Sequence, residues 1–127
     1  MARAQDRARF KLGIDSTEAP LYFDCSSFTQ WIFRQFDVEL PRHSVDQRET
    51  GYPVAFEERR LGDLIFRTGY RHNWVASDGE SVGHVGIVSS EGMIIHATNG
   101  GVCEEVLEAF LISPDRFRGI RRVLSER

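Results

Sequence analysis

The sequence predicts an α+β fold in which an N-terminal helix packs on an antiparallel β-sheet. A strong helical pattern begins near residue 24, and after residue 50 the pattern changes to short strands with short connections. This order, helix first and strands after it, is typical of α+β proteins with an antiparallel sheet. The chain has 127 residues, which is the length of one domain. We therefore expect residues 1–127 to form a single domain.

The helix is the clearest element of this prediction. Asp24 is a good N-cap residue, and Phe28, Trp31 and Phe36 recur after it with the spacing of one helical face. The first ten residues alternate alanine with charged residues and suit a second, shorter helix. We expect the longer helix to bury its apolar face against the sheet.

The strands follow as short runs of apolar and β-branched residues. Four segments have the composition of strands, 63–66, 85–88, 93–97 and 119–124, and residues 102–107 alternate loosely enough to form another. The segment 67–83 is long for a hairpin loop and contains two aromatic residues, Tyr70 and Trp74. Long structured loops of this kind are often functional.

Composition and charge exclude several classes of protein. Hydrophobic residues make up 41% of the chain and charged residues 28%, with a net charge of −3. A negative net charge argues against nucleic acid as a partner, because nucleic-acid binding needs a basic face. No apolar stretch approaches the roughly 20 residues that span a bilayer. The first residues are charged and lack the apolar core of a signal peptide, so both a cytoplasmic protein and part of an exported precursor remain open.

Cys25 is the first candidate for chemistry because it follows the predicted N-cap. The positive end of the helix dipole lowers a thiol pKa from about 8.5 toward neutrality and makes the sulfur a nucleophile. The alternative is a small buried residue, which is the commoner role of a single cysteine. We expect Cys25 and Cys103 to be free thiols, since a domain of this size needs no cross-link, although a disulfide between them stays open.

His84 and His96 flank a predicted hairpin whose turn lies in residues 89–92. A three-residue loop at 90–92 would pair Gly86 with His96 and place His84 on the same face of the sheet. One imidazole could then orient the other, as a relay of nucleophile, base and orienting residue requires. A two-residue loop would put the histidines on opposite faces. Taken singly, each histidine is more simply a strand residue with satisfied hydrogen bonds.

The same side chains belong to the types that bind zinc. Cys25, His84 and His96 are three scattered residues without a fourth ligand nearby, which is a weak zinc pattern. We therefore predict no metal and no cofactor. His43 and His72 have no partner that the sequence implies, and we interpret both as loop surface.

Five segments resemble motifs of the NlpC/P60 peptidase family and occur in the family's order. They are Phe23–Phe28 (F-D-C-S-S-F), Glu39–Ser44 (E-L-P-R-H-S) with Gln47, Leu61–Phe66 (L-G-D-L-I-F), Gly83–Val88 (G-H-V-G-I-V) and Ile94–Ala97 (I-I-H-A). A single motif of this length would be weak, whereas five in order are specific. The resemblance covers residues 10–124.

The resemblance implies a papain-like fold and a cysteine endopeptidase that cleaves peptidoglycan stem peptides, typically between D-glutamate and a diamino acid. It implies that Cys25 is the nucleophile, His84 the base and His96 the orienting residue. The substrate-binding positions that it implies are Asp24, Ser26, Phe10, Arg42 and Ser44. The expected partner is a peptidoglycan peptide, bound by a monomer that acts in the cell envelope or outside the cell if the chain is exported.

One departure from the family pattern keeps other functions open. The family carries an upstream Y-x-[WYF]-G-G segment, and the best match here is Phe10–Ile14 (F-K-L-G-I), which lacks the tyrosine hydroxyl. This difference favours another thiol amidase or acyltransferase on the same scaffold. An inactive binding module is a further alternative, but the presence of Cys25, His84 and His96 argues against it.

Overall fold

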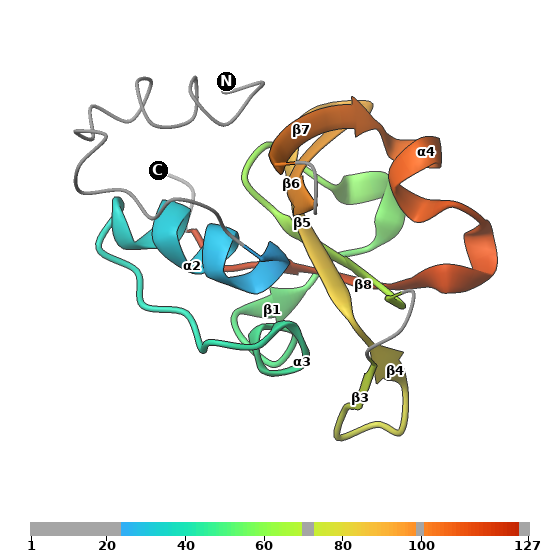
Figure 1. Ribbon diagram of the computed structural model, residues 1–127, viewed down its shortest axis with the longest axis horizontal. Coiled ribbons are helices and arrows are strands. Elements are labelled where there is room, and N and C mark those ends of the chain that lie inside the picture. The colour runs from blue at the N-terminus through green and yellow to red at the C-terminus, as the bar shows by residue number, and fades with distance from the viewer. Residues whose placement is uncertain (1–23, 70–72, 99–100, 125–127) are drawn as a thin grey trace.

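The fold is an antiparallel sheet with short helices packed against it (Figure 1), in a computed structural model that describes residues 24–69, 73–98 and 101–124. The strands of the sheet are β1 (Tyr52–Pro53), β2 (Leu64–Arg67), β5 (His84–Ser90), β6 (Met93–Thr98), β7 (Gly101–Val106) and β8 (Phe117–Arg122). Their order is β1-β8-β2-β5-β6-β7, and every neighbouring pair is antiparallel. The predicted α+β class is confirmed.

The helices are α2 (Cys25–Arg34), α3 (Ser44–Gln47) and α4 (Leu107–Leu111), with 3₁₀ turns η1 (Phe56–Glu58) and η2 (Pro114–Arg116). Of these, the sequence predicted only α2. The other four have three to five residues each, too short for a helical periodicity to emerge from the sequence.

Helix α2 begins where its cap predicts. Asp24 has extended backbone angles, and its Oδ1 accepts the Ser27 N–H at 2.7 Å while the Ser27 hydroxyl accepts the Asp24 N–H at 2.9 Å. This reciprocal capping box satisfies two of the amides that a helix start leaves without partners. Phe28 is buried as predicted, but Phe36 is 55% exposed. The helix ends at Arg34, so the expected apolar face does not extend to residue 36.

The sheet carries an apolar cluster on each face because its side chains alternate between the faces. On one face α2 packs on the sheet through Phe28, Trp31, Phe33, Leu64, Phe66, Val85, Ile87, Ile95 and Ala97. On the other face α4 packs on the sheet through Leu107, Phe110, Leu111, Ile65, Val88, Ile94 and Ile120. Figure 1 shows α2 and α4 on opposite sides of the strands.

The β5–β6 hairpin has the predicted register but a different turn from the predicted one. Ile87 pairs with Ile95 and Val88 with Ile94, which is the pairing that puts His84 and His96 on one face. The turn itself has two residues, because Ser90 pairs with Met93. A register shift between Val88 and Ser90 leaves one extra residue on β5, a β-bulge that restores the alternation. The predicted three-residue loop is therefore wrong, and the predicted face is correct.

The long segment 67–83 contains a small hairpin of its own, β3 (Trp74–Val75) and β4 (Ser81–Val82). Arg48 pairs with Asp78 at 3.0 Å, and Arg118 with Glu80 at 3.3 Å, so cations from two other parts of the chain fix its turn. Trp74 is 56% exposed at its base. This hairpin projects from the sheet and is visible below it in Figure 1.

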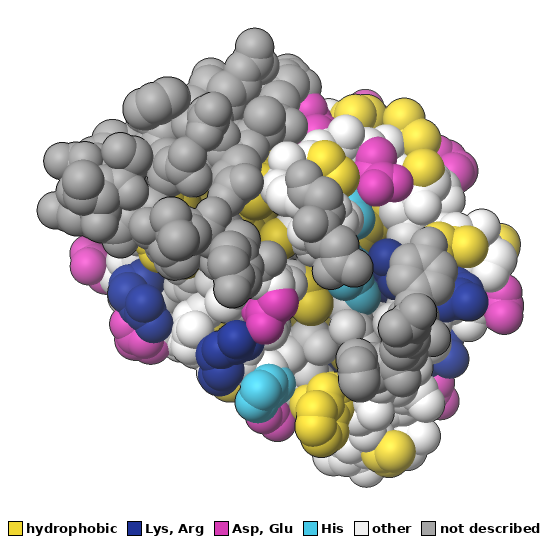
Figure 2. Space-filling model, viewed as in Figure 1, with side chains coloured by type: hydrophobic (Ala, Val, Ile, Leu, Met, Phe, Trp, Pro, Cys, Tyr) yellow, Lys and Arg dark blue, Asp and Glu magenta, His cyan; other side chains and the backbone are white. Residues whose placement is uncertain are grey.

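The surface in view carries charges of both signs. Figure 2 shows Arg side chains interspersed with Asp and Glu, without a continuous basic area on the face in view. No helix among the described residues is long and apolar enough to cross a membrane. The predicted N-terminal helix, Phe10 and His72 lie outside the described residues.

Candidate active site

Cys25 is the first residue of α2 and is half-buried. Its Sγ lies 3.9 Å from the carbonyl oxygen of Gly83, and the backbone N–H of Val85 interacts with the same sulfur. These two backbone groups belong to the residues on either side of His84. The helix start and the start of β5 therefore meet at the thiol, as the sequence predicted for Cys25 and His84.

His84 and His96 form a direct contact between their rings. Nε2 of His84 lies 2.7 Å from Nδ1 of His96, and the two rings are nearly perpendicular. Nε2 of His96 in turn lies 2.8 Å from Oε2 of Glu105 on the neighbouring strand β7. A row of three side chains thus crosses β5, β6 and β7, and Glu105 is a member that the sequence analysis missed.

The hydrogen bonds of this row fix the protons on both rings. An ionised carboxylate only accepts, so His96 donates from Nε2 to Glu105 and has a lone pair at Nδ1. His84 must then donate from Nε2 to His96, which leaves the Nδ1 of His84 as a free acceptor. A neutral His84 with this tautomer can accept a proton at Nδ1.

The row packs against apolar and cationic neighbours on the α4 face. The ring of Phe110 lies 4.9 Å from the ring of His96 and 5.6 Å from that of His84. Gly86, between the two histidine positions, has no side chain, and a Cβ there would lie 2.9 Å from Phe110. The guanidinium of Arg67 lies over Phe110 at 5.2 Å, and its Nη1 donates to the Thr68 carbonyl at 2.7 Å.

These surroundings keep both imidazoles neutral. Burial, the positive charge of Arg67 and the neighbouring His96 together lower the pKa of His84 to about 2, with burial as the largest cause. Burial also lowers the pKa of His96, against the opposing effect of the Glu105 carboxylate. His84 is therefore in its neutral form, the form that a general base requires, throughout the physiological pH range.

The resting thiol differs from the sequence-based expectation. Burial raises the pKa of Cys25, although the N–H groups of Val85 and Ser26 act in the opposite direction. The expected lowering by the helix dipole is therefore wrong for the resting protein. Desolvation wins because the sulfur packs against the apolar cluster below α2. The resting pair is a neutral thiol beside a neutral imidazole.

A charged network surrounds the start of α2. Arg42 donates to Asp24 Oδ2 at 2.8 Å and to Ser26 Oγ at 2.9 Å. Partial burial raises the pKa of Asp24, but the hydrogen bonds from Arg42 and Ser27 lower it to about 2. Asp24 is therefore ionised and remains 57% exposed, one residue before the thiol.

The remaining predicted substrate positions differ from one another in accessibility. Ser26 and Ser44 are each only 5% exposed, whereas Arg42 is exposed. Gln47 links Ser26 to Pro41, because its Nε2 donates to the backbone carbonyls of both residues, at 3.0 and 2.8 Å. The structure thus brings Asp24, Ser26 and Arg42 together beside Cys25, and substrate contact by these residues and by Ser44 stays a prediction.

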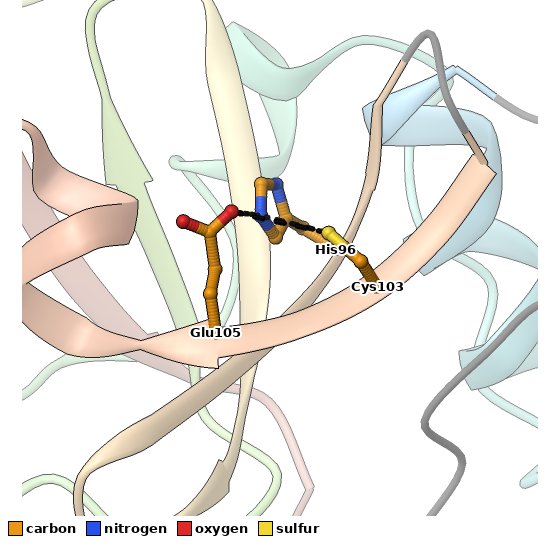
Figure 3. Close-up of side chains that lie close together, drawn as sticks. All are labelled: His96, Cys103 and Glu105. Atoms are coloured by element: carbon orange, nitrogen blue, oxygen red, sulfur yellow. Dashed lines mark hydrogen bonds and ion pairs between the residues drawn. The ribbon is translucent and has the colours of Figure 1, made fainter.

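The second cysteine also lies in the site region. Cys25 and Cys103 are both free thiols, as predicted. Cys103 is on β7, and its Sγ lies 3.7 Å from Nε2 of His96 (Figure 3). The metal-binding types that cluster within the described part of the chain are His96, Cys103 and Glu105, rather than the group of Cys25, His84 and His96 considered from the sequence.

A thiol at a helix start, close in the fold to two imidazoles that contact each other, is the arrangement expected of a cysteine peptidase. The chain belongs to the NlpC/P60 family, whose sequence profile matches residues 7–121. It is 37% identical over 121 residues to the murein DD-endopeptidase and murein LD-carboxypeptidase MepS of Escherichia coli K12, covering 92% of this chain and 56% of MepS.

Two further comparisons agree with this membership. The chain is 36% identical over 98 residues to a probable endopeptidase of Corynebacterium glutamicum, covering 74% of this chain and 41% of that protein. The crystal structure of an NlpC/P60 family protein from Bacillus cereus matches with a TM-score of 0.66 at 30% identity, covering 81% of this chain and 32% of that chain. The chain spans about half the length of the curated relatives that it matches.

Proposed function

We propose that this chain is the catalytic domain of a cysteine endopeptidase that hydrolyses peptidoglycan stem peptides. The observation that carries the proposal is the 2.7 Å contact between His84 Nε2 and His96 Nδ1, which leaves His84 Nδ1 as a proton acceptor. His84 is also the residue between Gly83 and Val85, whose backbone groups contact the Cys25 sulfur. The murein endopeptidase name of the E. coli relative supports peptidoglycan as the substrate.

The reaction starts from the neutral pair. His84 Nδ1 accepts the Cys25 thiol proton as the sulfur attacks the scissile carbonyl, so the charged pair forms only during the reaction. The N–H of Cys25, in the first turn of α2, can donate to the developing oxyanion. The imidazolium of His84 then protonates the leaving amine, and water hydrolyses the acyl-thioester with His84 again acting as base.

Glu105 acts through His96 and does not touch the substrate. Its carboxylate holds the proton on Nε2 of His96, and this in turn holds the proton on Nε2 of His84. When His84 becomes positively charged, its Nε2–H still donates to the lone pair of His96 Nδ1. The Glu105 carboxylate, on the far side of the His96 ring, adds a negative charge nearby. Glu105 is therefore a positioning residue that stabilises both the resting tautomer and the imidazolium.

The start of α2 suits a substrate with a positively charged amine. The Asp24 carboxylate is ionised, exposed and adjacent in sequence to the nucleophile. Arg42 holds it by a hydrogen bond of 2.8 Å, so the carboxylate is oriented before the substrate arrives. A stem peptide with a free N-terminal amine could then place its ammonium group on Asp24 and an amide bond close to that amine near Cys25.

The scissile bond has two candidates. The family resemblance favours the bond between D-glutamate and the diamino acid, which lies close to the free amine of a trimmed stem peptide. The DD-endopeptidase name of the E. coli relative favours a cross-link between two D-amino acids instead. Either activity would act on the cell wall, and we propose that the domain works there as a monomer without a metal or cofactor.

Digestion of purified peptidoglycan followed by mass spectrometry of the released muropeptides tests the proposal. We expect new amino termini at the diamino acid, absent from a parallel digest with the Cys25→Ala variant. Cleavage only at cross-links would support the second candidate. Products that also form with Cys25→Ala, or no cleavage of any stem peptide by the native chain, would contradict the proposed function.

A further inference from the structure

Two side chains of metal-binding types on strand β7 lie beside His96. Cys103 and Glu105 are two residues apart on the strand, so their side chains lie on the same face. Cys103 pairs directly with His96 across β6 and β7. Figure 3 shows both side chains pointing from β7 toward the imidazole of His96. Neither the fold nor the proposed hydrolysis requires a thiol at this position.

We propose that His96, Cys103 and Glu105 bind a divalent ion of the zinc class, and that the bound ion switches off the proposed peptidase. The binding half of this inference stands on the geometry alone. The inhibitory half rests on the proposed function, because it requires His84 to act as the base.

Two of the three distances between the donor atoms are close to those around a tetrahedral zinc ion, and the third is a hydrogen bond that the ion would replace. Zn–N, Zn–O and Zn–S bonds of about 2.0–2.3 Å at tetrahedral angles separate neighbouring ligand atoms by roughly 3.4–3.6 Å. Here Cys103 Sγ lies 3.7 Å from His96 Nε2 and 3.9 Å from Glu105 Oε2, and Nε2 and Oε2 are 2.8 Å apart. Small side-chain rotations, without movement of the strands, would complete the three positions.

The cluster is also accessible from solvent on one side. His96 is 2% exposed, whereas the Glu105 side chain is 33% exposed and Cys103 is half-buried. Because β7 is the edge strand of the sheet, the ion can enter between Cys103 and Glu105. Three protein ligands with water in the fourth position form a common zinc geometry.

The donor types select among metals. A thiolate and an imidazole favour zinc and similar borderline-soft ions over calcium and magnesium, which prefer oxygen ligands. Cobalt(II) occupies the same tetrahedral sites and has a visible spectrum, so it is a suitable probe of the site.

Metal binding would reverse the proton pattern of the row. The ion takes the lone pair of His96 Nε2, so the proton of that ring moves to Nδ1 and is donated to Nε2 of His84. His84 then carries its own proton on Nδ1 and has no lone pair for the thiol of Cys25. Each ring keeps one proton, and the net release is the single proton of the Cys103 thiol. The peptidase would be inactive while the ion is bound.

Cobalt titration of the full chain carrying Cys25→Ser tests the binding half without any activity. We expect the visible bands of tetrahedral cobalt and a thiolate-to-cobalt charge-transfer band, both reversed by a chelator. Adding Cys103→Ala should remove the charge-transfer band, whereas adding Glu104→Gln, a change on the opposite face of β7, should leave it. Absence of the band from Cys25→Ser, or its persistence without Cys103, would overturn the proposal.

Zinc inhibition of muropeptide cleavage tests the second half, with each variant compared with its own metal-free rate. We expect saturating zinc to slow the native chain by about a hundredfold, the order of a general-base contribution, and to slow Cys103→Ala far less. Equal inhibition of both would mean that zinc acts at Cys25 and would overturn the switch. A cobalt site in a chain without peptidase activity would reject the proposed function and the switch but retain the metal site.

Discussion

The thiol and the imidazoles of the site are held by two different kinds of structure. Cys25 lies in the first turn of a helix whose cap Asp24 and neighbouring cation Arg42 are both about half exposed, at 57% and 48%. The histidines and Glu105 lie in a row across three strands, in which His96 is 2% exposed, the Glu105 side chain is 33% exposed and His84 is partly exposed. One side of the site is formed by residues that are close in sequence and exposed to solvent. The other side is formed by residues that are distant in sequence and largely buried.

This difference determines how each side responds to change. An exposed ion pair contributes about 0–1 kcal/mol, because water replaces a lost partner. A buried group that loses its hydrogen-bond partner costs about 1–3 kcal/mol and has no such substitute. We therefore expect the strand side to govern the chemical step, and the helix side to govern substrate binding with small effects on stability.

Replacing the base should have the largest effect. In His84→Ala the Cys25 thiol loses its proton acceptor, and we expect kcat to fall by about 10²–10⁴-fold. His96→Ala should cause a smaller loss, since a neutral His84 can still accept a proton. Steady-state kinetics on one muropeptide measure both. If His84→Ala retained most of its activity, the strand side would not contain the base.

Glu105→Gln should have the next largest effect. A Gln amide can donate to His96 Nε2 and thereby stabilise the wrong tautomer in both rings, so we expect kcat to fall by about 10–100-fold with little change in KM. The matched control is Glu104→Gln on the opposite face of β7, where the carboxylate accepts from Ser89 at 2.6 Å. Equal effects of the two variants would show that Glu105 has a general structural role only.

Gly86→Ala should reveal how tightly the row is packed. The added Cβ would lie 2.6 Å from Ile94 Cγ2, 2.9 Å from Phe110 Cε1 and 3.3 Å from His96 Cβ. We expect a loss of about 1–3 kcal/mol in the free energy of unfolding, measured by denaturant titration. Gly92→Ala is the control, because no atom lies within 4 Å of a Cβ there. Unchanged stability of Gly86→Ala would mean that the row can shift freely.

Arg42→Met should have the smallest effect and should separate the two sides. Without Arg42 the pKa of Asp24 should rise from about 2 toward 3.8, and stability should change by less than about 1 kcal/mol. We expect KM to rise for substrates with a free amine while kcat stays unchanged. Arg34→Met, which breaks the still more exposed pair with Glu39, is the control. A large fall in kcat would contradict the division of roles.

The two sides also differ in how far the sequence predicts them. Asp24 and Cys25 are adjacent in the chain, so the cap and the helix start could be predicted from a few residues. The pairing of His84 with His96 was predicted with the right face but the wrong turn, because a bulge between Val88 and Ser90 adds a residue that no local pattern indicates.

Glu105 could not be assigned without knowledge of the strand pairing. Its contact with His96 depends on the β6–β7 register, in which Cys103 lies opposite His96 and Glu105 follows on the same face. The available signal was the spacing of two residues between Cys103 and Glu105, which places both side chains on one face of a strand. Residues 102–107 alternate too weakly, however, for a strand to be predicted there with its register. The raised thiol pKa was missed for a related reason, since burial of Cys25 depends on packing and the helix dipole does not.

The protonation of His84 is the most direct test of the account. Nitrogen-15 NMR of labelled histidines in the Cys25→Ser chain reports the charge and the tautomer of each ring. Because burial lowers the pKa of His84 to about 2, its ring should remain neutral as the pH falls through the usual histidine pKa of about 6.5, with the proton on Nε2 in both His84 and His96. A His84 ring that becomes protonated near that pH, or that carries its neutral proton on Nδ1, would contradict the proposed relay.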